Sequence, residues 1–213
     1  GKLRNYISFF KQRYEKDMHV FIGGLEGLVR QIYYAGDVQQ ARGFEGLAAR
    51  RIYKRLNGFI DHEAFHLKKR ERRNPDRINS LLNFGYYLLF SRINATVRAI
   101  GLNPYLGFLH SDQDNYESLV CDIEELFRAK IDRLIVRLIN LKMITEDDFI
   151  GAENGWYLKK EAVKIFVSEF EAEMEKKNPK NTLSFKEEVY IQTMIVKKWA
   201  LENGALSFYR WET

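Results

Sequence analysis

The chain has 213 residues, of which 46% are apolar and 30% are charged, and its net charge is +5. This composition suits a folded domain with a real core and excludes a disordered segment. The single cysteine, Cys121, excludes an internal disulfide, and no uncharged apolar run is long enough for a membrane span. No apolar run follows a basic start, so we expect no signal peptide and a cytoplasmic location.

Apolar residues recur at three- and four-residue spacing, a period that predicts α-helices almost throughout. We expect helices over 3–17, 19–35, 38–59, 75–100, 116–142, 159–177 and 185–203. Asn74-Pro75 predicts a helix start, Gly101 a helix end, and Ser184 with Glu187 a capping box. A small two-stranded ribbon is expected within 149–158.

The helix expected over 75–100 is apolar on several faces, which is typical of a buried central helix. Its apolar residues are Ile78, Leu81, Leu82, Tyr86, Leu89, Phe90, Ile93 and Val97. The expected fold class is therefore all-α, a helical bundle around this central helix. We expect one helical domain over 1–213, with a core at 1–145 and a C-terminal helical extension at 146–213.

Positive charge gathers in the first part of the chain. Residues 1–77 hold 17 Lys and Arg against 9 Asp and Glu, whereas residues 78–213 hold 17 against 20. A basic segment favours a polyanion, mainly nucleic acid, although a solubilising surface explains the charge equally well. The candidates for phosphate contacts are Arg50, Arg51, Lys54, Arg70, Arg72, Arg73 and Arg77.

Acids and one histidine are the candidates for chemistry. Glu45 stands among small residues in GFEGLAAR, and His110 ends the apolar segment GFLH. Asp122 and Glu125 are three residues apart, so they share one face of their helix at the edge of its apolar side. Carboxylates and a neutral imidazole suit Mg²⁺ or Mn²⁺. Structural roles explain the same residues: a solvated glutamate, a hydrogen-bonded histidine, and acids favouring a helix dipole.

The sequence lacks the residues that several other classes of enzyme need. There is no serine or cysteine nucleophile in a known motif, no phosphate-binding glycine loop, and no zinc spacing with one cysteine. Metal-dependent phosphoryl transfer needs none of these, because a metal and nearby cations hold the reacting strand.

Three segments in this order resemble the family of CRISPR-associated protein one, the integrase subunit of spacer acquisition. They are GFEGLAARRIY at 43–53, NPDRINSLLNFGYYLLFSRINATVRAIGLNPYLGFLH at 74–110 and SLVCDIEELFR at 118–128. The resemblance implies a metal held by Glu45, His110 and Glu125, with Asp122 as a neighbouring catalytic acid. It also implies a transesterification in which the 3′-hydroxyl of incoming DNA attacks a phosphodiester of the CRISPR array.

The resemblance further implies three partners: prespacer and array DNA, a small CRISPR-associated acquisition subunit and, in the full-length family, a second copy. The family's N-terminal β-domain does not precede these helices, so we expect a shortened chain or a fusion, for example to a reverse transcriptase. No membrane partner is expected. Two alternatives stay open. One is a metal-dependent DNase or casposon-type transposase with the same site, and the other is a nucleic-acid-binding or assembly module without catalysis.

Overall fold

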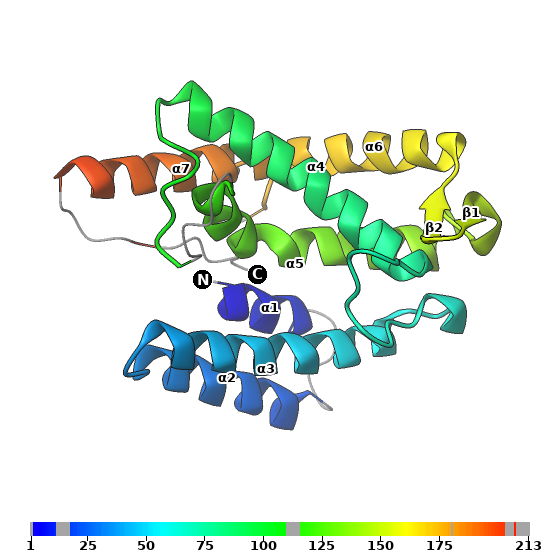
Figure 1. Ribbon diagram of the computed structural model, residues 1–213, viewed down its shortest axis with the longest axis horizontal. Coiled ribbons are helices and arrows are strands. Elements are labelled where there is room, and N and C mark those ends of the chain that lie inside the picture. The colour runs from blue at the N-terminus through cyan, green and yellow to red at the C-terminus, as the bar shows by residue number, and fades with distance from the viewer. Residues whose placement is uncertain (1, 12–17, 110–115, 180, 203–206, 208–213) are drawn as a thin grey trace. The chain divides into compact units, whose positions relative to one another are not determined.

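A computed structural model describes residues 2–11, 18–109, 116–179, 181–202 and 207 (Figure 1). These residues form seven α-helices and one two-stranded hairpin, which confirms the expected all-α class and the small ribbon. Within the described ranges, no helix is long and apolar enough to cross a membrane.

The helices lie close to the ranges that the apolar period predicts, and residues 12–17 of the helix expected over 3–17 lie outside the described residues. Their bounds are α1 Lys2–Lys11, α2 His19–Tyr33, α3 Val38–Leu56, α4 Arg77–Ala99, α5 Ser118–Asn140, α6 Lys160–Glu175 and α7 Phe185–Glu202. The hairpin pairs β1 Phe149–Ala152 with β2 Gly155–Leu158 in antiparallel register. Short 3₁₀ turns cover Asn57–Phe59, Glu63–Phe65 and Glu146–Asp148.

The chain divides into two compact units. The first unit takes residues 1–29, 87–129 and 174–213, and the second takes 30–86 and 130–173. The division runs through α2, α4, α5 and α6, so both units draw on both halves of the sequence. The expected core at 1–145 and extension at 146–213 stay a prediction.

Helix ends follow local capping chemistry. The capping box of α7 is confirmed, because the Ser184 backbone N–H donates to Glu187 Oε2 at 2.6 Å and the Glu187 N–H donates to Ser184 Oγ at 3.4 Å. Gly101, at φ +79°, ends α4 as expected, with Leu102 N–H donating to Val97 O. The start of α4 differs by two residues: Asp76, not Asn74, caps it by accepting from the Asn79 N–H at 2.9 Å.

In the first unit, α5 contacts α1 and α7. The Asn5 side chain of α1 donates to Leu126 O of α5 at 2.7 Å, so a buried amide fixes this pair of helices. Phe127 of α5 packs on Phe185 of α7 with ring centroids 5.6 Å apart. Aromatic side chains of α1, including Phe9 and Phe10, complete this core and are at most 1% exposed.

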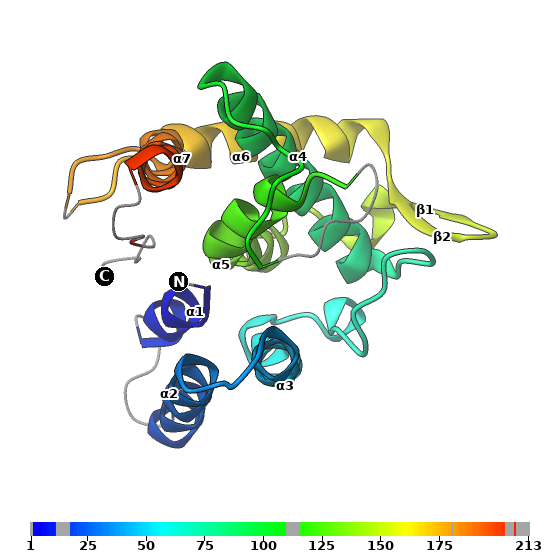
Figure 2. The same ribbon diagram turned by 60° about the vertical axis from the view of Figure 1, so that its left-hand side comes forward.

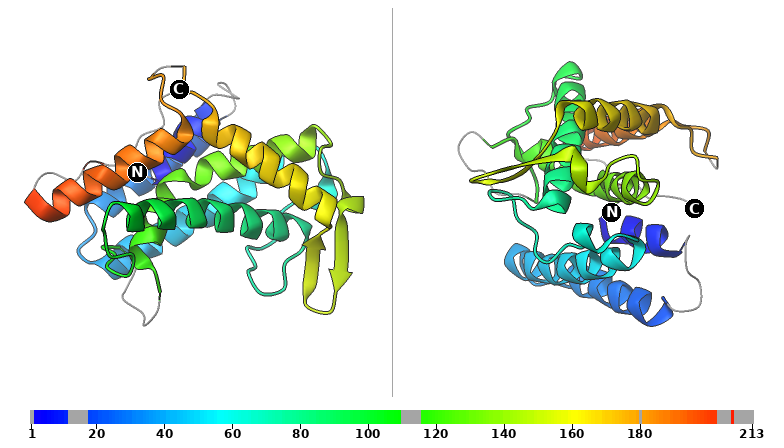
Figure 3. Two further views of the ribbon diagram at one scale, coloured as in Figure 1. Left: turned by 90° about the horizontal axis from the view of Figure 1, so that it is seen from above. Right: turned by 90° about the vertical axis from the view of Figure 1, so that its right-hand side faces the viewer.

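In the second unit, α4, α5 and α6 pack closely, as the views from two directions show (Figures 1 and 3). Gly85 of α4 permits the approach, because a Cβ there would lie 2.6 Å from Ile131 of α5 and 3.1 Å from Phe166 of α6. Beside it, Tyr86 donates its hydroxyl to the buried carboxylate of Asp132 at 2.5 Å.

The hairpin docks on the loop before α4. Gly155 has φ +128°, and a Cβ there would lie within 3 Å of Pro75. The Trp156 N–H donates to Pro75 O at 2.8 Å, so the hairpin is hydrogen-bonded to this loop. The left view of Figure 3 shows the two segments side by side, and Figure 2 shows the hairpin joining the start of α6.

The two long helices, α4 and α5, are buried to different extents than the sequence predicts. Of the eight apolar residues named for α4, seven are buried and Phe90 is half-buried. Phe84 and Leu88 of α4 are also half-buried, and the helix keeps an exposed face at Tyr87, Ser91 and Ala95. α5 is buried along nearly its whole length, although it carries Asp122, Glu124, Glu125, Lys130 and Asp132 at buried positions. These charges lower its hydropathy, so α4 looked like the more buried helix in the sequence.

Candidate metal centre and nucleic-acid interface

Three acids lie together in the first turns of α5. Asp122, Glu124 and Glu125 are 4%, 3% and 7% exposed, although carboxylates are rarely buried without partners. They stand among apolar residues of α5, such as Leu119 and Ile123, which lie in the core. Asp122 and Glu125 share one helical face, as their spacing predicts.

The Asp122 side chain is hydrogen-bonded to the backbone just before His110. A single carboxylate oxygen, Oδ2, accepts the backbone N–H groups of Phe108 at 2.6 Å and Leu109 at 2.9 Å. Gly107 lets this segment approach, because a Cβ there would lie 2.8 Å from the same oxygen. The carboxylate therefore fixes the backbone that leads to His110, which itself lies outside the described residues.

Ser118, the first residue of α5, holds the same segment from its other end. Its hydroxyl accepts the Gly107 N–H at 2.8 Å and donates to Tyr105 O at 2.6 Å. Nearby, Glu117 accepts from Asn94 at 3.1 Å and from Arg98 at 3.2 Å, which ties the start of α5 to α4 within the first unit.

Two cations neutralise the glutamates. Glu125 pairs with Lys2 Nζ at 2.5 Å and with Arg128 Nη1, and Glu124 pairs with Arg128 Nη2 at 3.2 Å. Sequence reasoning missed both cations. The spacing of three and four residues could have found Arg128, but no local signal connects Lys2 with α5. A metal bound by Glu125 would compete with Lys2 for this carboxylate.

Glu45 belongs to the second unit. It lies half-buried on α3, next to the buried Ala48. Apart from neighbouring residues and the backbone of α3 itself, no described atom lies within 4 Å of a Cβ built at Gly43 or Gly46. Asp122 and Glu125 belong to the first unit, and His110 is not described. Convergence of these residues on one metal therefore stays a prediction. Within the described part of the chain, no three His, Cys, Asp or Glu side chains gather as a metal site.

Cys121 is a poor nucleophile. It is 5% exposed, and burial raises the pKa of its thiol above the ordinary value, against a smaller opposite effect from its hydrogen bond to Tyr116. Its Sγ donates to the Tyr116 hydroxyl at 3.1 Å. The thiol therefore stays protonated near neutral pH, where only a thiolate would attack.

The predicted phosphate-binding residues separate into two groups. Arg50, Arg51 and Lys54 on α3, and Arg72 and Arg73 before α4, are exposed and form no salt bridge within 4 Å among the residues described, although the Glu71 carboxylate attracts Arg73.

Arg70 and Arg77 make internal contacts instead. Arg70 donates to Asn79 Oδ1 at 3.0 Å and lies over the Tyr86 ring at 5.5 Å. Arg77 lies 3.8 Å from the centroid of Trp156. Their guanidinium groups hold the loop and the hairpin against α4, so the first group is the better candidate for DNA.

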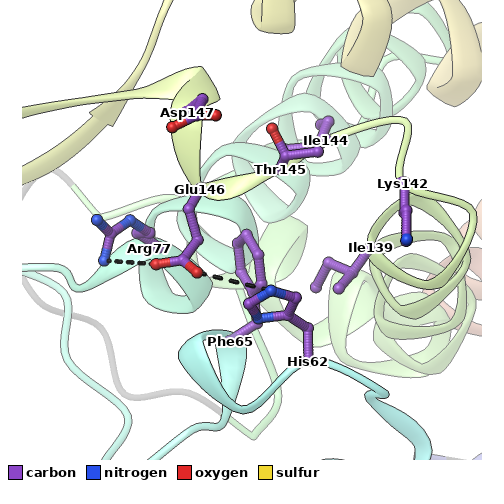
Figure 4. Close-up of a pocket in the computed structure, with 9 residues that line it drawn as sticks. All are labelled: His62, Phe65, Arg77, Ile139, Lys142, Ile144, Thr145, Glu146 and Asp147. Atoms are coloured by element: carbon purple, nitrogen blue, oxygen red, sulfur yellow. Dashed lines mark ion pairs between the residues drawn. The ribbon is translucent and has the colours of Figure 1, made fainter.

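Arg77 also borders a hollow of about 480 Å³ in the second unit (Figure 4). There Glu146 lies between Arg77, at 3.7 Å, and His62, at 3.6 Å. Lys142 and Asp147 complete the charged part of the lining. Sequence reasoning missed this cluster, because its members are scattered from 62 to 147 without a common spacing.

Comparison with known proteins identifies the family. A family model described as CRISPR associated protein Cas1 matches residues 1–172, most of the chain. The chain belongs to the Cas1 family. The resemblance seen in the sequence is thereby confirmed.

Among curated relatives, a CRISPR-associated endonuclease Cas1 from Leptospira interrogans is 37% identical over 161 residues, covering 70% of this chain and 63% of that protein. A solved Cas1 protein from Thermotoga maritima matches with a TM-score of 0.87 at 26% identity, covering 99% of this chain and 65% of that one. A chain of a Cas6-RT-Cas1–Cas2 complex also matches with a TM-score of 0.87, at 25% identity, and this chain spans 24% of it. The chain thus spans less than two thirds of the length of these relatives.

Proposed function

We propose that this chain is the helical catalytic part of a CRISPR integrase. It would join the 3′-hydroxyl of incoming DNA to a CRISPR array by metal-dependent transesterification. The observation that carries the proposal is the buried acid cluster of α5 in a Cas1 family chain. Asp122 of that cluster is bonded to the two residues that precede His110.

The donor set suits a hard divalent cation. We propose that Glu45, His110 and Glu125 bind Mg²⁺ or Mn²⁺, because carboxylate oxygens with one imidazole nitrogen match their preferences. When bound, the ion would stabilise the charge on the attacking and leaving oxygens. Asp122 would hold the segment before His110 in place. Burial of Glu125 excludes water from its carboxylate and strengthens its attraction for a cation.

The exposed cations of α3 and of the loop before α4 would hold DNA phosphates. Arg50, Arg51 and Lys54 lie on the same helix as Glu45, so phosphate contacts and a metal ligand share one rigid element. The relative named as a Cas6-RT-Cas1–Cas2 complex contains Cas2. We propose a small acquisition subunit of this kind as a partner, together with prespacer and array DNA and a second copy of the protein. A fusion to a reverse transcriptase and a cytoplasmic location are proposed on the same family grounds.

The test is strand transfer by the full native protein with Mg²⁺ or Mn²⁺, using labelled DNA ends and a plasmid carrying a CRISPR array. Glu45→Ala, His110→Ala and Glu125→Ala should each abolish joining while duplex binding persists. Glu153→Ala, on the exposed hairpin turn, and His19→Ala, on the exposed face of α2, are matched controls that should join normally.

Each alternative gives a different result. Cleavage without joining would support a DNase, and joining without preference for the array would support a transposase. DNA binding with no metal-dependent chemistry would support a binding module. Full activity in the Glu45→Ala, His110→Ala and Glu125→Ala triple variant would refute the proposed site.

A further inference from the structure

Lys2 of α1 pairs with the α5 carboxylate that we propose as a metal ligand. Its Nζ lies 2.5 Å from Glu125 Oε2, an atom that is buried from solvent. The side chains of the two residues are 16% and 9% exposed, so the pair is screened less by water and salt than an ordinary surface pair. The ammonium group therefore occupies a carboxylate for which a divalent ion would compete.

The two cations that contact Glu125 differ in how firmly they are held. Arg128 belongs to the same helix and pairs with two carboxylates at once, because Nη1 contacts Glu125 while Nη2 lies 3.2 Å from Glu124. Its planar, forked group suits this double contact. Lys2 brings a point charge on a flexible aliphatic stem. Its ammonium group can therefore leave Glu125 by rotation of the side chain alone.

The backbone that carries Lys2 is fixed against α5. Asn5, one turn further along α1, is buried and donates its side-chain N–H to Leu126 O at 2.7 Å. Leu126 follows Glu125 directly, so this bond holds α1 beside the acid cluster (Figures 1 and 2). A change of partner by Lys2 thus needs no movement of α1.

We propose that Lys2 changes partners when a divalent ion and DNA bind. Its ammonium group leaves the Glu125 carboxylate to the ion and contacts a phosphate of the DNA strand instead. Phosphate is the natural second partner, because the proposed reaction brings a phosphodiester to this carboxylate and lysine binds phosphate as a point charge. This inference rests on the proposed DNA-joining function and adds a residue that couples metal binding to DNA binding.

Such an exchange makes the two ligands bind cooperatively. A phosphate that draws Lys2 away removes a competitor of the ion, and release of Lys2 from Glu125 supplies a cation to DNA. By thermodynamic linkage, Mn²⁺ raises DNA affinity by the same factor as DNA raises Mn²⁺ affinity. Direct contact between the ion and phosphate adds to that factor. The share due to Lys2 is therefore the difference between wild type and a variant without the ammonium group.

The test measures both affinities on the full native protein with one blunt duplex. Electron paramagnetic resonance gives free Mn²⁺, with a DNA-only blank, and anisotropy of an end label gives DNA affinity. Without DNA, Lys2→Gln should bind Mn²⁺ roughly 5-fold or more tightly than wild type, because no ammonium group competes. The factor by which DNA raises Mn²⁺ affinity should fall by the same amount. Lys2→Arg keeps the charge and should bind Mn²⁺ more weakly than wild type, because a forked guanidinium pairs more firmly with a carboxylate.

Salt dependence gives the second arm. With Mn²⁺ present, Lys2→Gln should flatten the dependence of duplex affinity on salt by about 0.9, the value for one lost phosphate contact. Without Mn²⁺ its slope should equal that of wild type, because Lys2 then stays on Glu125. Lys11→Gln is the matched control. It removes an equal charge from an exposed position of the same helix, where Lys11 pairs with Glu26 at 3.4 Å, and should match wild type in every measurement.

An Mn²⁺ affinity of Lys2→Gln equal to or below that of wild type would overturn the inference, because Lys2 would then support Glu125 instead of competing for it. A salt slope that Lys2→Gln changes equally with and without Mn²⁺ would also overturn it, since Lys2 would then contact DNA permanently. Strand transfer by wild type separates these failures from failure of the proposed function. Wild-type joining, together with a Lys2→Gln variant that behaves like Lys11→Gln, refutes only the exchange, whereas a wild type that neither binds Mn²⁺ nor joins DNA refutes both.

Discussion

Replacing Asp122 tests whether its carboxylate positions the segment before His110 or binds the metal directly. Its Oδ2 accepts two backbone N–H groups, at 2.6 and 2.9 Å, from a segment that is partly exposed. Hydrogen bonds to a charged group contribute about 1.5–3 kcal/mol each, so losing both costs about 3–6 kcal/mol. Water reaches the segment and replaces part of this, which leaves about 2–4 kcal/mol for Asp122→Ala. In Asp122→Asn one amide oxygen still accepts both N–H groups, as neutral bonds of about half the strength, so the cost is about 1–2 kcal/mol.

Urea unfolding followed by circular dichroism measures these costs, with the exposed Asp61→Asn as a control near zero. If Asp122 acts by positioning the segment before His110, Asp122→Asn should keep Mn²⁺ affinity and much of the strand-transfer rate, whereas Asp122→Ala should lose most of the rate. A variant Asp122→Asn that is stable yet loses Mn²⁺ binding would show a direct ligand. Equal stability of Asp122→Ala and wild type would refute the anchoring contact itself.

Four further predictions concern stability and DNA. Leu89→Ala, at a fully buried position of α4, should lower the free energy of unfolding by about 2–5 kcal/mol in urea titrations. Replacing Arg50, Arg51 and Lys54 with Gln should weaken duplex binding alike for different sequences and reduce its salt slope by about 0.9 per lost contact. Arg70→Gln should instead destabilise the fold and leave that slope unchanged, because its guanidinium binds Asn79. The backbone N–H and then the hydroxyl of Ser184 lower the pKa of Glu187 below 4.5. Its capping bonds therefore stabilise α7 above about pH 4.5, and this stabilisation is lost as the pH falls through the lower pKa of the folded state. Over that pH range, thermal melts should show that wild type loses more stability than Glu187→Gln.

Much of the fold was predictable because its determinants are local. The apolar period located the helices within a few residues, and Ser184 with Glu187 and Gly101 marked two ends by chemistry that acts within one turn. The hairpin was found for the same reason, since its strands pair across a two-residue turn. Asp76 was missed as the cap of α4 because Asn74-Pro75 offered a competing start signal two residues earlier.

The unpredicted parts depend on contacts between distant residues. Lys2 pairs with Glu125 although more than a hundred residues separate them in the sequence, and no local pattern near either residue predicts this salt bridge. Arg70 and Arg77 look like the other arginines of the basic segment, yet Asn79 and Trp156 bind them internally. Counting Lys and Arg residues in the sequence therefore overstated the number of side chains that can contact DNA, because only the folded chain shows which guanidinium groups already have internal partners.

The composition of α5 itself argues for a site rather than for stability. Buried ion pairs seldom stabilise a fold more than well-packed apolar residues do, because removing charges from water costs several kcal/mol per ion. Glu124 and Glu125 occupy such positions on α5 next to the half-buried Arg128, and Lys2 comes from a separate helix to complete the pairing. An apolar α5 would be the more stable solution for packing alone. Acids held at this cost, next to the segment that Asp122 fixes, support the metal site proposed for this end of α5.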